Sequence, residues 1–218
     1  MSNFNLYPHN KESYEKIMEG FKTSNIVGIV HATGTGKSFN ALEYVSDNTN
    51  ENILYVVPSL GIIEHLKNII AKSGFVLEKD FPNLKFCTYM SFVNLSREEL
   101  KNVKVDTLIL DEFHHLGAPV WGARINTLLK THPNVKVLGM TAYTVRDRNT
   151  PYERDMANPD TDELFSNHIV SRYDLCDAMV DGVLPKPIYK TAYVNLIEDV
   201  DYLEKRLDNL DHNSSKYI

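Results

Sequence analysis

The distribution of apolar residues along the chain predicts alternating strands and helices. A continuous apolar run with β-branched residues, which is typical of a strand buried on both faces, occurs at 53–57. Mostly apolar segments that also predict strands occur at 26–30, 103–110 and 135–140. A weaker strand is predicted at 84–88. Apolar residues at helical spacing between these runs predict helices near 14–21, 39–45, 63–70 and 121–128. Buried strands that alternate with helices favour an α/β fold with a mainly parallel sheet.

Polar residues at the ends of these segments predict where the helices begin. Asn10 is well placed as the N-cap of the first helix. Ser59, which follows the strand at 53–57 and Pro58, can cap the next helix. The sequence Ser96-Arg97-Glu98-Glu99 is a capping box that predicts a short helix.

The pattern changes from about residue 143, where the sequence becomes loop-like. Short elements are predicted after this point, followed by a helix at 200–210. The short elements are expected at 162–165, 168–172, 174–180 and 188–194. We therefore divide the chain into a main domain, 1–150, and a C-terminal extension, 151–218.

Composition narrows the class of protein. The 218 residues are 43% apolar and 24% charged, as in an ordinary globular domain. The formal net charge of −6 leaves no overall basic field, so any contact with nucleic acid would come from a local patch or from another part of the protein. Cys87 and Cys176 predict neither a disulfide framework nor a zinc site. Since the sequence has no leader and no long apolar run, we expect a cytoplasmic protein without a membrane span.

One stretch has the residues of a phosphate-binding loop. The sequence His31-Ala32-Thr33-Gly34-Thr35-Gly36-Lys37-Ser38 lies between the first strand and a helix. In this setting, backbone N–H groups and the helix N-terminus bind phosphates. Lys37 would reach the β- and γ-phosphates, and the Ser38 hydroxyl would bind Mg²⁺. The other candidate ligands in the loop are Thr33, Gly34, Thr35 and Gly36.

Two observations qualify this prediction. The general pattern has a small residue where this chain has His31, and we can assign no role to that histidine. A Gly-Thr-Gly surface turn before a helix is the alternative interpretation of the stretch.

Two carboxylates at the end of another strand strengthen the prediction. Asp111 and Glu112 follow the apolar run at 103–110. In a phosphate-loop ATPase, an aspartate here holds Mg²⁺, and the next glutamate can act as general base on the attacking water. Because ligands bind at the carboxyl ends of parallel strands, we expect both residues beside Lys37 and predict a site for ATP and Mg²⁺. The alternative is a solvated strand end whose aspartate caps a helix.

In this order, the motifs resemble those of superfamily 2 helicases and translocases, and closest the branch of the type I and III restriction-enzyme motor subunits. The stretch 31–38 resembles their first motif, Ala-Thr-Gly-x-Gly-Lys-Thr, and 111–114 resembles their Asp-Glu-x-His box. Weaker likenesses cover nearly the whole chain. They are 6–10 (the adenine-side segment), 57–59 (motif Ia), 88–89 (a strand-contacting motif), 139–142 (motif III), 154–165 and 182–187.

The resemblance implies a three-layer RecA-like P-loop NTPase domain and adds roles on the nucleotide side. Tyr7 and Asn10 would lie near the adenine. His114 and Thr141 would couple the ATP site to movement. Without the resemblance, His114 is a hydrogen-bonded histidine at a strand end.

The resemblance also implies contacts with nucleic acid, DNA rather than RNA, through Ser59, Thr88 and Tyr89. Without it, these three residues are a helix cap and loop residues. We expect this part of the protein to bind nucleic acid only weakly by itself.

Three features depart from the family pattern. Asn10 stands where a glutamine is usual, and Tyr143-Thr144 stand where Thr-Pro is usual. The sequence also ends at Ile218, before the second RecA-like lobe that supplies an arginine finger in the family. We therefore expect the first lobe of such a motor, partnered by a second lobe. The alternative is a P-loop regulatory or scaffold module that binds nucleotide and a protein partner without translocation.

Overall fold

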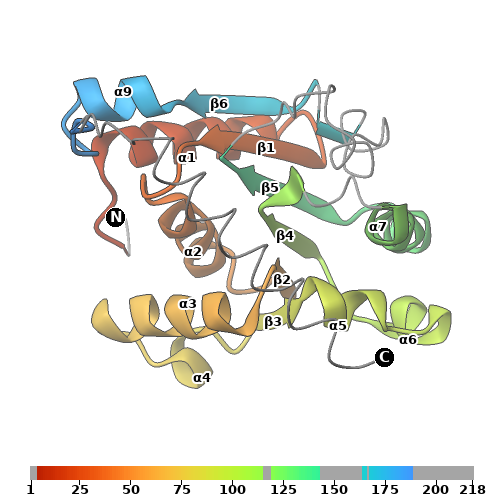
Figure 1. Cartoon of the computed structure of the whole chain (residues 1–218). Helices are drawn as coiled ribbons and strands as arrows, with labels where there is room; N and C mark the ends of the chain where they lie inside the picture. The colour runs from red at the N-terminus through yellow and green to blue at the C-terminus, as the bar shows by residue number, and fades with distance from the viewer. Residues whose placement is uncertain (1–3, 115–118, 143–163, 166, 189–218) are drawn as a thin grey trace, which may run out of the picture. The chain divides into compact units, whose positions relative to one another are not determined.

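The computed structural model describes residues 4–114, 119–142, 164–165 and 167–188. These residues fold around a six-stranded sheet in which neighbouring strands pair in parallel (Figure 1). The strands are β1 (Ile26–His31), β2 (Ile53–Val57), β3 (Leu84–Thr88), β4 (Thr107–Asp111), β5 (Lys136–Thr141) and β6 (Ile169–Tyr173). Their order is β3-β2-β4-β5-β1-β6. The predicted α/β fold with a parallel sheet is confirmed.

Helices cover both faces of the sheet, which gives the three layers expected of a RecA-like domain. One face carries α1 (Pro8–Gly20), α2 (Lys37–Asp47), α3 (Leu60–Lys72) and the short α4 (Leu77–Asp80). The other face carries α5 (Tyr89–Val93), α6 (Arg97–Asn102) and α7 (Pro119–Thr131). The remaining helix, α9 (Leu175–Val180), follows β6. Within the described ranges, no helix is long and apolar enough to cross a membrane.

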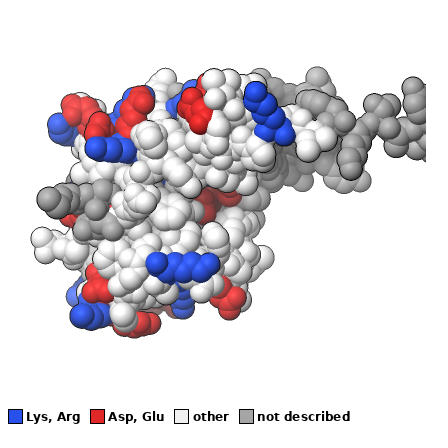
Figure 2. Space-filling view, turned by 90° about the vertical axis from the view of Figure 1, so that its left-hand side faces the viewer, with Lys and Arg blue, Asp and Glu red and all other residues white. Residues whose placement is uncertain are grey.

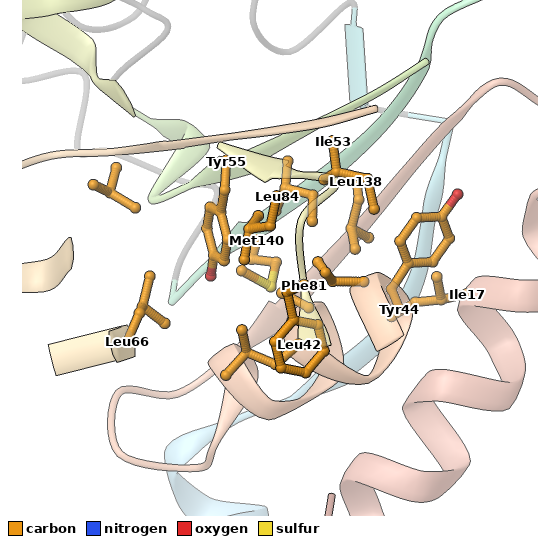
Figure 3. Packing of buried hydrophobic residues seen from close by; sticks show 14 of the residues in the cluster. Ile17, Leu42, Tyr44, Ile53, Tyr55, Leu66, Phe81, Leu84, Leu138 and Met140 are labelled. Atoms are coloured by element: carbon orange, nitrogen blue, oxygen red, sulfur yellow. The ribbon is translucent and has the colours of Figure 1, made fainter. Parts of the chain in front are cut away.

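Each central strand contributes to two cores because successive side chains point to opposite faces of a sheet. On β4, Ile109 belongs to the cluster that includes Leu42 of α2 and Leu66 of α3, two residues labelled in Figure 3. Its neighbours Leu108 and Leu110 belong to the cluster under α5, α6 and α7. All three β4 side chains are fully buried. This double burial explains why the three consecutive residues 108–110 are all apolar.

The structure corrects several predicted element ends. The strand predicted at 103–110 begins only at Thr107. Helix α1 begins at Pro8 with Tyr7 at the N-cap position, so Asn10 lies inside the helix and does not cap it. Proline suits the first helical turn, where its missing N–H would have no helical partner.

Two predicted caps have different outcomes. Ser59 occupies the N-cap position of α3, but its side chain makes no capping hydrogen bond. The capping box that begins at Ser96 is present in full at the start of α6.

The segment after residue 166 adds an edge strand to the sheet. β6 lies beside β1, and the Ala32 amide donates to the Tyr173 carbonyl oxygen at 2.8 Å. Contacts place residues 1–185, with β6 and α9, in one compact unit. The domain boundary predicted at residue 150 and the helix predicted at 200–210 fall on residues that are not described, and so does all but the first residue of the element predicted at 188–194. These three stay predictions.

Candidate nucleotide site

The loop between β1 and α2 has the backbone shape that its glycines make possible. Gly34 (φ 85°) and Gly36 (φ 87°) are both left-handed, a conformation that residues with a Cβ adopt only at a cost. A Cβ on Gly36 would also lie 2.7 Å from Nδ2 of Asn10. Gly36 directly precedes α2, so the free backbone N–H groups of the first helical turn face the loop.

Lys37 is the first residue of α2 and is largely buried, with 8% of its side chain exposed. Its Nζ donates to the carbonyl oxygen of His31 at 3.0 Å and lies 4.0 Å from Oε1 of Glu112. Burial lowers the pKa of Lys37, while the charges of Glu112 and then Asp111 act in the opposite direction. The predicted phosphate-binding lysine therefore lies beside the predicted acidic residues.

Asp111 ends β4 and is 7% exposed. Its Oδ1 accepts a hydrogen bond from the Glu112 amide at 3.1 Å. Burial, and then the neighbouring charge of Glu112, raise the pKa of Asp111 to about 6. A buried carboxylate of this kind is destabilised in its charged form, and a bound cation would stabilise it.

Glu112 has a left-handed backbone, with φ 51°, and no other non-glycine residue in the described ranges has a positive φ. Its carboxylate lies near the ammonium group of Lys37 and the side chains of His114 and Thr141. Burial acts to raise the pKa of Glu112, but hydrogen bonding to His114 and the charge of Lys37 outweigh it and lower the pKa. Glu112 is therefore ionised at neutral pH, as a general base must be.

The two residues predicted to couple the site to movement contact each other. Nδ1 of His114 lies 2.7 Å from Oγ1 of Thr141. Both side chains also reach Oε2 of Glu112, at 3.3 Å in each case. The ends of β4 and β5 thus share one polar cluster, made of Glu112, His114 and Thr141. Tyr143 and Thr144, where the motif departs from the family pattern, lie outside the described residues.

The predicted adenine-side residues lie at the start of α1. Tyr7 is 56% exposed, whereas Asn10 is fully buried under the phosphate loop. Nδ2 of Asn10 donates to the Thr35 carbonyl oxygen at 2.9 Å. The same carbonyl oxygen lies 2.7 Å from Nε2 of His9. Asn10 therefore supports the loop, and reading of an adenine by this residue stays a prediction.

Sequence reasoning missed His9, and it left His31 without a role. His31 is fully buried, and its Nε2 lies 2.9 Å from Oγ of Ser171 on β6. Burial lowers the pKa of His31 to about 4, with smaller contributions from the charges of His9 and Lys37. His31 is thus a neutral residue that packs the phosphate loop against β6. The local sequence carries no signal for this contact, because Ser171 is 140 residues away.

The three candidate nucleic-acid contacts have different surroundings. Ser59 is exposed, and Thr88 is half-buried with its Oγ1 accepting from the Ser91 amide at 3.1 Å. Tyr89 is only 1% exposed. Its hydroxyl donates to the Asp111 carbonyl oxygen at 2.9 Å, and its ring stacks on Trp121 with centroids 4.6 Å apart. The prediction for the Tyr89 side chain is corrected: it belongs to the core and does not reach the surface.

Charge on the face at the ends of β1 and β6 is mixed. Figure 2 shows acidic atoms in a recess of this face, with basic side chains spread around it and not gathered into one patch. The whole chain has a formal net charge of −6 and therefore no overall basic field. Strong binding to a nucleic-acid backbone by this face alone is therefore not expected.

The residues present fit a magnesium ion held jointly with a nucleotide. No group of three or more His, Cys, Asp or Glu side chains arranged for a metal occurs in the described part of the chain. Mg²⁺ commonly uses only one or two protein oxygens together with phosphates and water. Ser38 in the first turn of α2 and the buried Asp111 carboxylate supply oxygens of the right kind.

The chain matches one described protein family and shares its fold with several solved structures. Residues 3–146 match the family model described as type III restriction enzyme, res subunit. No curated protein matches the chain.

Several solved structures share the fold. The SWI2/SNF2 ATPase core of Sulfolobus solfataricus in complex with dsDNA aligns with a TM-score of 0.55 at 15% identity, over 84% of this chain and 47% of that chain. The Hef helicase domain of Pyrococcus furiosus gives a TM-score of 0.55 at 18% identity, over 75% of this chain and 37% of that one. The type ISP restriction-modification enzyme LlaGI, in complex with a DNA substrate mimic, gives a TM-score of 0.54 at 16% identity, over 97% of this chain and 23% of that chain. The chain thus spans about half the length of the first structure and less of the others.

Proposed function

Since the chain belongs to the family of the res subunit of type III restriction enzymes, we propose that it is the ATP-binding first lobe of a superfamily 2 motor that couples Mg-ATP hydrolysis to movement on DNA. One observation carries the proposal. Lys37, at the start of α2, lies 4.0 Å from Glu112, which follows β4. Two sequence motifs that are more than seventy residues apart therefore share one site.

From these contacts and the family resemblance, we assign a task to each residue. Loop amides and the N-terminus of α2 would bind the β- and γ-phosphates. Lys37 would exchange its hydrogen bond to the His31 carbonyl oxygen for these phosphates. Ser38 and Asp111 would hold Mg²⁺, which when bound neutralises charge on the phosphate oxygens. Glu112, kept ionised by His114 and Lys37, would accept a proton from the attacking water.

Hydrolysis by this chain alone is expected to be very slow. An arginine finger contributes about three to five orders of magnitude in rate, and the family resemblance assigns it to a second lobe. The chain covers only 47% of the SWI2/SNF2 core. We therefore propose that a second RecA-like lobe completes the ATPase site.

Two structural neighbours support DNA as the track. The SWI2/SNF2 core and the type ISP enzyme LlaBIII are both described in complex with DNA. On this chain, Ser59 and Thr88 remain the proposed contacts, because the Tyr89 side chain is buried.

A nucleotide-binding regulatory or scaffold module is the second candidate function. The observations that favour it are the net charge of −6 and the spread of basic side chains in Figure 2. DNA-stimulated ATP hydrolysis by a protein that carries both lobes would support the motor. Hydrolysis that neither DNA nor RNA stimulates would support the module.

The nucleotide site itself is tested by calorimetric titration of the purified chain with Mg-ADP. We expect binding by the wild-type chain and at least about a tenfold loss of affinity in Lys37→Ala, because one charged contact to phosphate is lost. Lys72→Ala, at an exposed lysine in the last turn of α3, is the matched control and should bind normally. Equal affinity in Lys37→Ala and Lys72→Ala would overturn the assignment.

A further inference from the structure

The carbonyl group of Thr35 is held from one side by two donors. Nε2 of His9 lies 2.7 Å from its oxygen, and Nδ2 of Asn10 lies 2.9 Å from it. A carbonyl oxygen can only accept, so His9 carries a proton on Nε2 and donates it. Thr35 itself is fully buried, and its hydroxyl donates to the Ala32 carbonyl oxygen at 2.7 Å.

Holding this carbonyl also fixes an amide of the phosphate loop. The peptide unit is planar and trans, so the C=O of Thr35 and the N–H of Gly36 point in opposite directions. Gly36 has φ 87° and, as a glycine, its backbone rotates more freely than that of any other residue. The two donors of α1 therefore aim the Gly36 N–H away from α1.

His9 is oriented in turn by Tyr173, the last residue of β6. Its ring stacks on Tyr173, with centroids 4.3 Å apart and planes within 7°. The Tyr173 hydroxyl donates to Oδ2 of Asp181, at the end of α9, at 2.9 Å. The His9 ring also lies near-parallel to that of Tyr7, with centroids 5.8 Å apart.

We propose that His9, stacked on Tyr173, is a positioning residue that presets the Gly36 amide for a nucleotide phosphate. β6 and α9 thereby become part of the nucleotide site, although they lie beyond the residues 3–146 that match the family model. The inference rests on the proposed binding of nucleotide by this chain.

The first test separates the donor from the ring. His9→Phe keeps an aromatic ring for Tyr173 and removes the donor to Thr35. We expect the affinity of the full chain for Mg-ADP, measured by calorimetry, to fall about five- to tenfold, the equivalent of one hydrogen bond. His65→Phe, at an exposed histidine of α3, is the matched control and should bind as the wild type does.

A second readout reports the amide directly and requires no ligand. In the ¹⁵N-glycine spectrum, His9→Phe should shift or broaden the Gly36 amide resonance. Gly74 is the matched control, because it follows α3 and has the same φ of 87°. Its resonance should stay in place. A loss of stability alone would not single out Gly36.

The role of Tyr173 is tested by two substitutions, one that keeps the ring and one that removes it. Tyr173→Phe keeps the stacked ring and should retain affinity within about twofold, whereas Tyr173→Ala should weaken binding as much as His9→Phe does. Because the two residues act on one amide, the double variant His9→Phe/Tyr173→Ala should bind Mg-ADP with the same affinity as either single variant.

The outcomes are distinguishable. A wild-type chain that fails to bind Mg-ADP overturns the proposed function and this inference with it. Wild-type binding, together with unchanged affinity and an unchanged Gly36 resonance in His9→Phe, overturns this inference alone.

Discussion

Individual residues around the phosphate loop are held in states that the surrounding fold must stabilise. Glu112 has a left-handed backbone, Asp111 has a carboxylate with a raised pKa, and His31 is an imidazole kept neutral by burial. Such states are unfavourable in an isolated peptide and cluster at functional sites. Each has a measurable effect on stability.

The buried His31 predicts a pH dependence of folding. Its pKa of about 4 lies below the ordinary value of 6.5, so between these values the unfolded chain binds a proton that the folded chain does not. The contribution of neutral His31 to the free energy of unfolding is therefore fully present above pH 6.5. It decreases by about 3 kcal/mol at most as the pH falls to 4. Urea unfolding of wild type and His31→Gln across this range should show a smaller slope in the variant.

Other groups also titrate in this range, so the comparison needs a control. His65→Gln alters an exposed histidine and should keep the wild-type slope. A His31→Gln profile parallel to that of the wild type would show that His31 is not the source of the dependence.

Asp111 predicts an opposition between stability and function. Because its folded pKa of about 6 is raised, the charged carboxylate destabilises the fold above that pH. Asp111→Asn should therefore increase the free energy of unfolding at pH 8 by about 1–3 kcal/mol while abolishing Mg²⁺-dependent binding of nucleotide.

Asp106 supplies a control of opposite sign. Hydrogen bonds from the amide and side chain of Asn52 lower the pKa of Asp106, so Asp106→Asn should reduce stability under the same conditions. A lower free energy of unfolding in Asp111→Asn would contradict the inference that the charged Asp111 carboxylate destabilises the fold.

At the scale of secondary-structure elements, a second polar cluster joins the opposite end of the sheet. Glu51, just before β2, accepts hydrogen bonds from Tyr44 of α2 at 2.9 Å and from Thr107 of β4 at 2.6 Å. It also forms an ion pair with Lys136 of β5 at 2.6 Å. One carboxylate thus connects three elements at the amino ends of the strands.

This cluster predicts a change in stability without a change in binding. Glu51→Gln removes the charge that three donors share and should lower the free energy of unfolding by about 1–2 kcal/mol, since the site is partly exposed. The Mg-ADP affinity should remain that of the wild type, because the cluster lies at the opposite end of the strands from the nucleotide site. A parallel loss of affinity would show that the two ends of the sheet are coupled.

The sequence predicts those helices and strands that are determined by neighbouring residues. Apolar runs located the central strands, and the capping box located α6. The apolar pattern predicts too early a start for β4, because Val103 and Val105 are apolar but lie in the connection before the strand, where Val105 packs into the core. The position of β6 beside β1 depends on contacts between distant segments, and no periodicity in the chain encodes it.

In the candidate site, too, the local motifs are predictable from the sequence and the contacts between distant segments are not. The motifs at Lys37 and Glu112 were predicted, and the structure brings them together. The support of the loop by His9 and Tyr173 was not predicted, because each residue has an ordinary local context. Tyr89 followed the family pattern in sequence, but its neighbour Trp121 holds it in the core.

At the scale of the whole molecule, the compact unit of residues 1–185 predicts the result of truncation. A chain that ends after Pro185 should keep the thermal midpoint and Mg-ADP affinity of the full chain. A chain that ends after residue 167 lacks β6 and α9, which exposes one side of β1, and should unfold at a lower temperature and lose affinity. Unchanged affinity in the shorter chain would contradict a role for β6 in the nucleotide site.

The stack of Trp121 on Tyr89 has a practical consequence. Trp121 is the single tryptophan of the chain, and the Tyr89 hydroxyl is bonded to the backbone of Asp111. The emission of one indole is therefore connected, through one ring and one hydrogen bond, to the end of β4, where Asp111, the proposed ligand of Mg²⁺, lies. The protein contains its own fluorescent probe at that position, and events there can be timed without an attached dye.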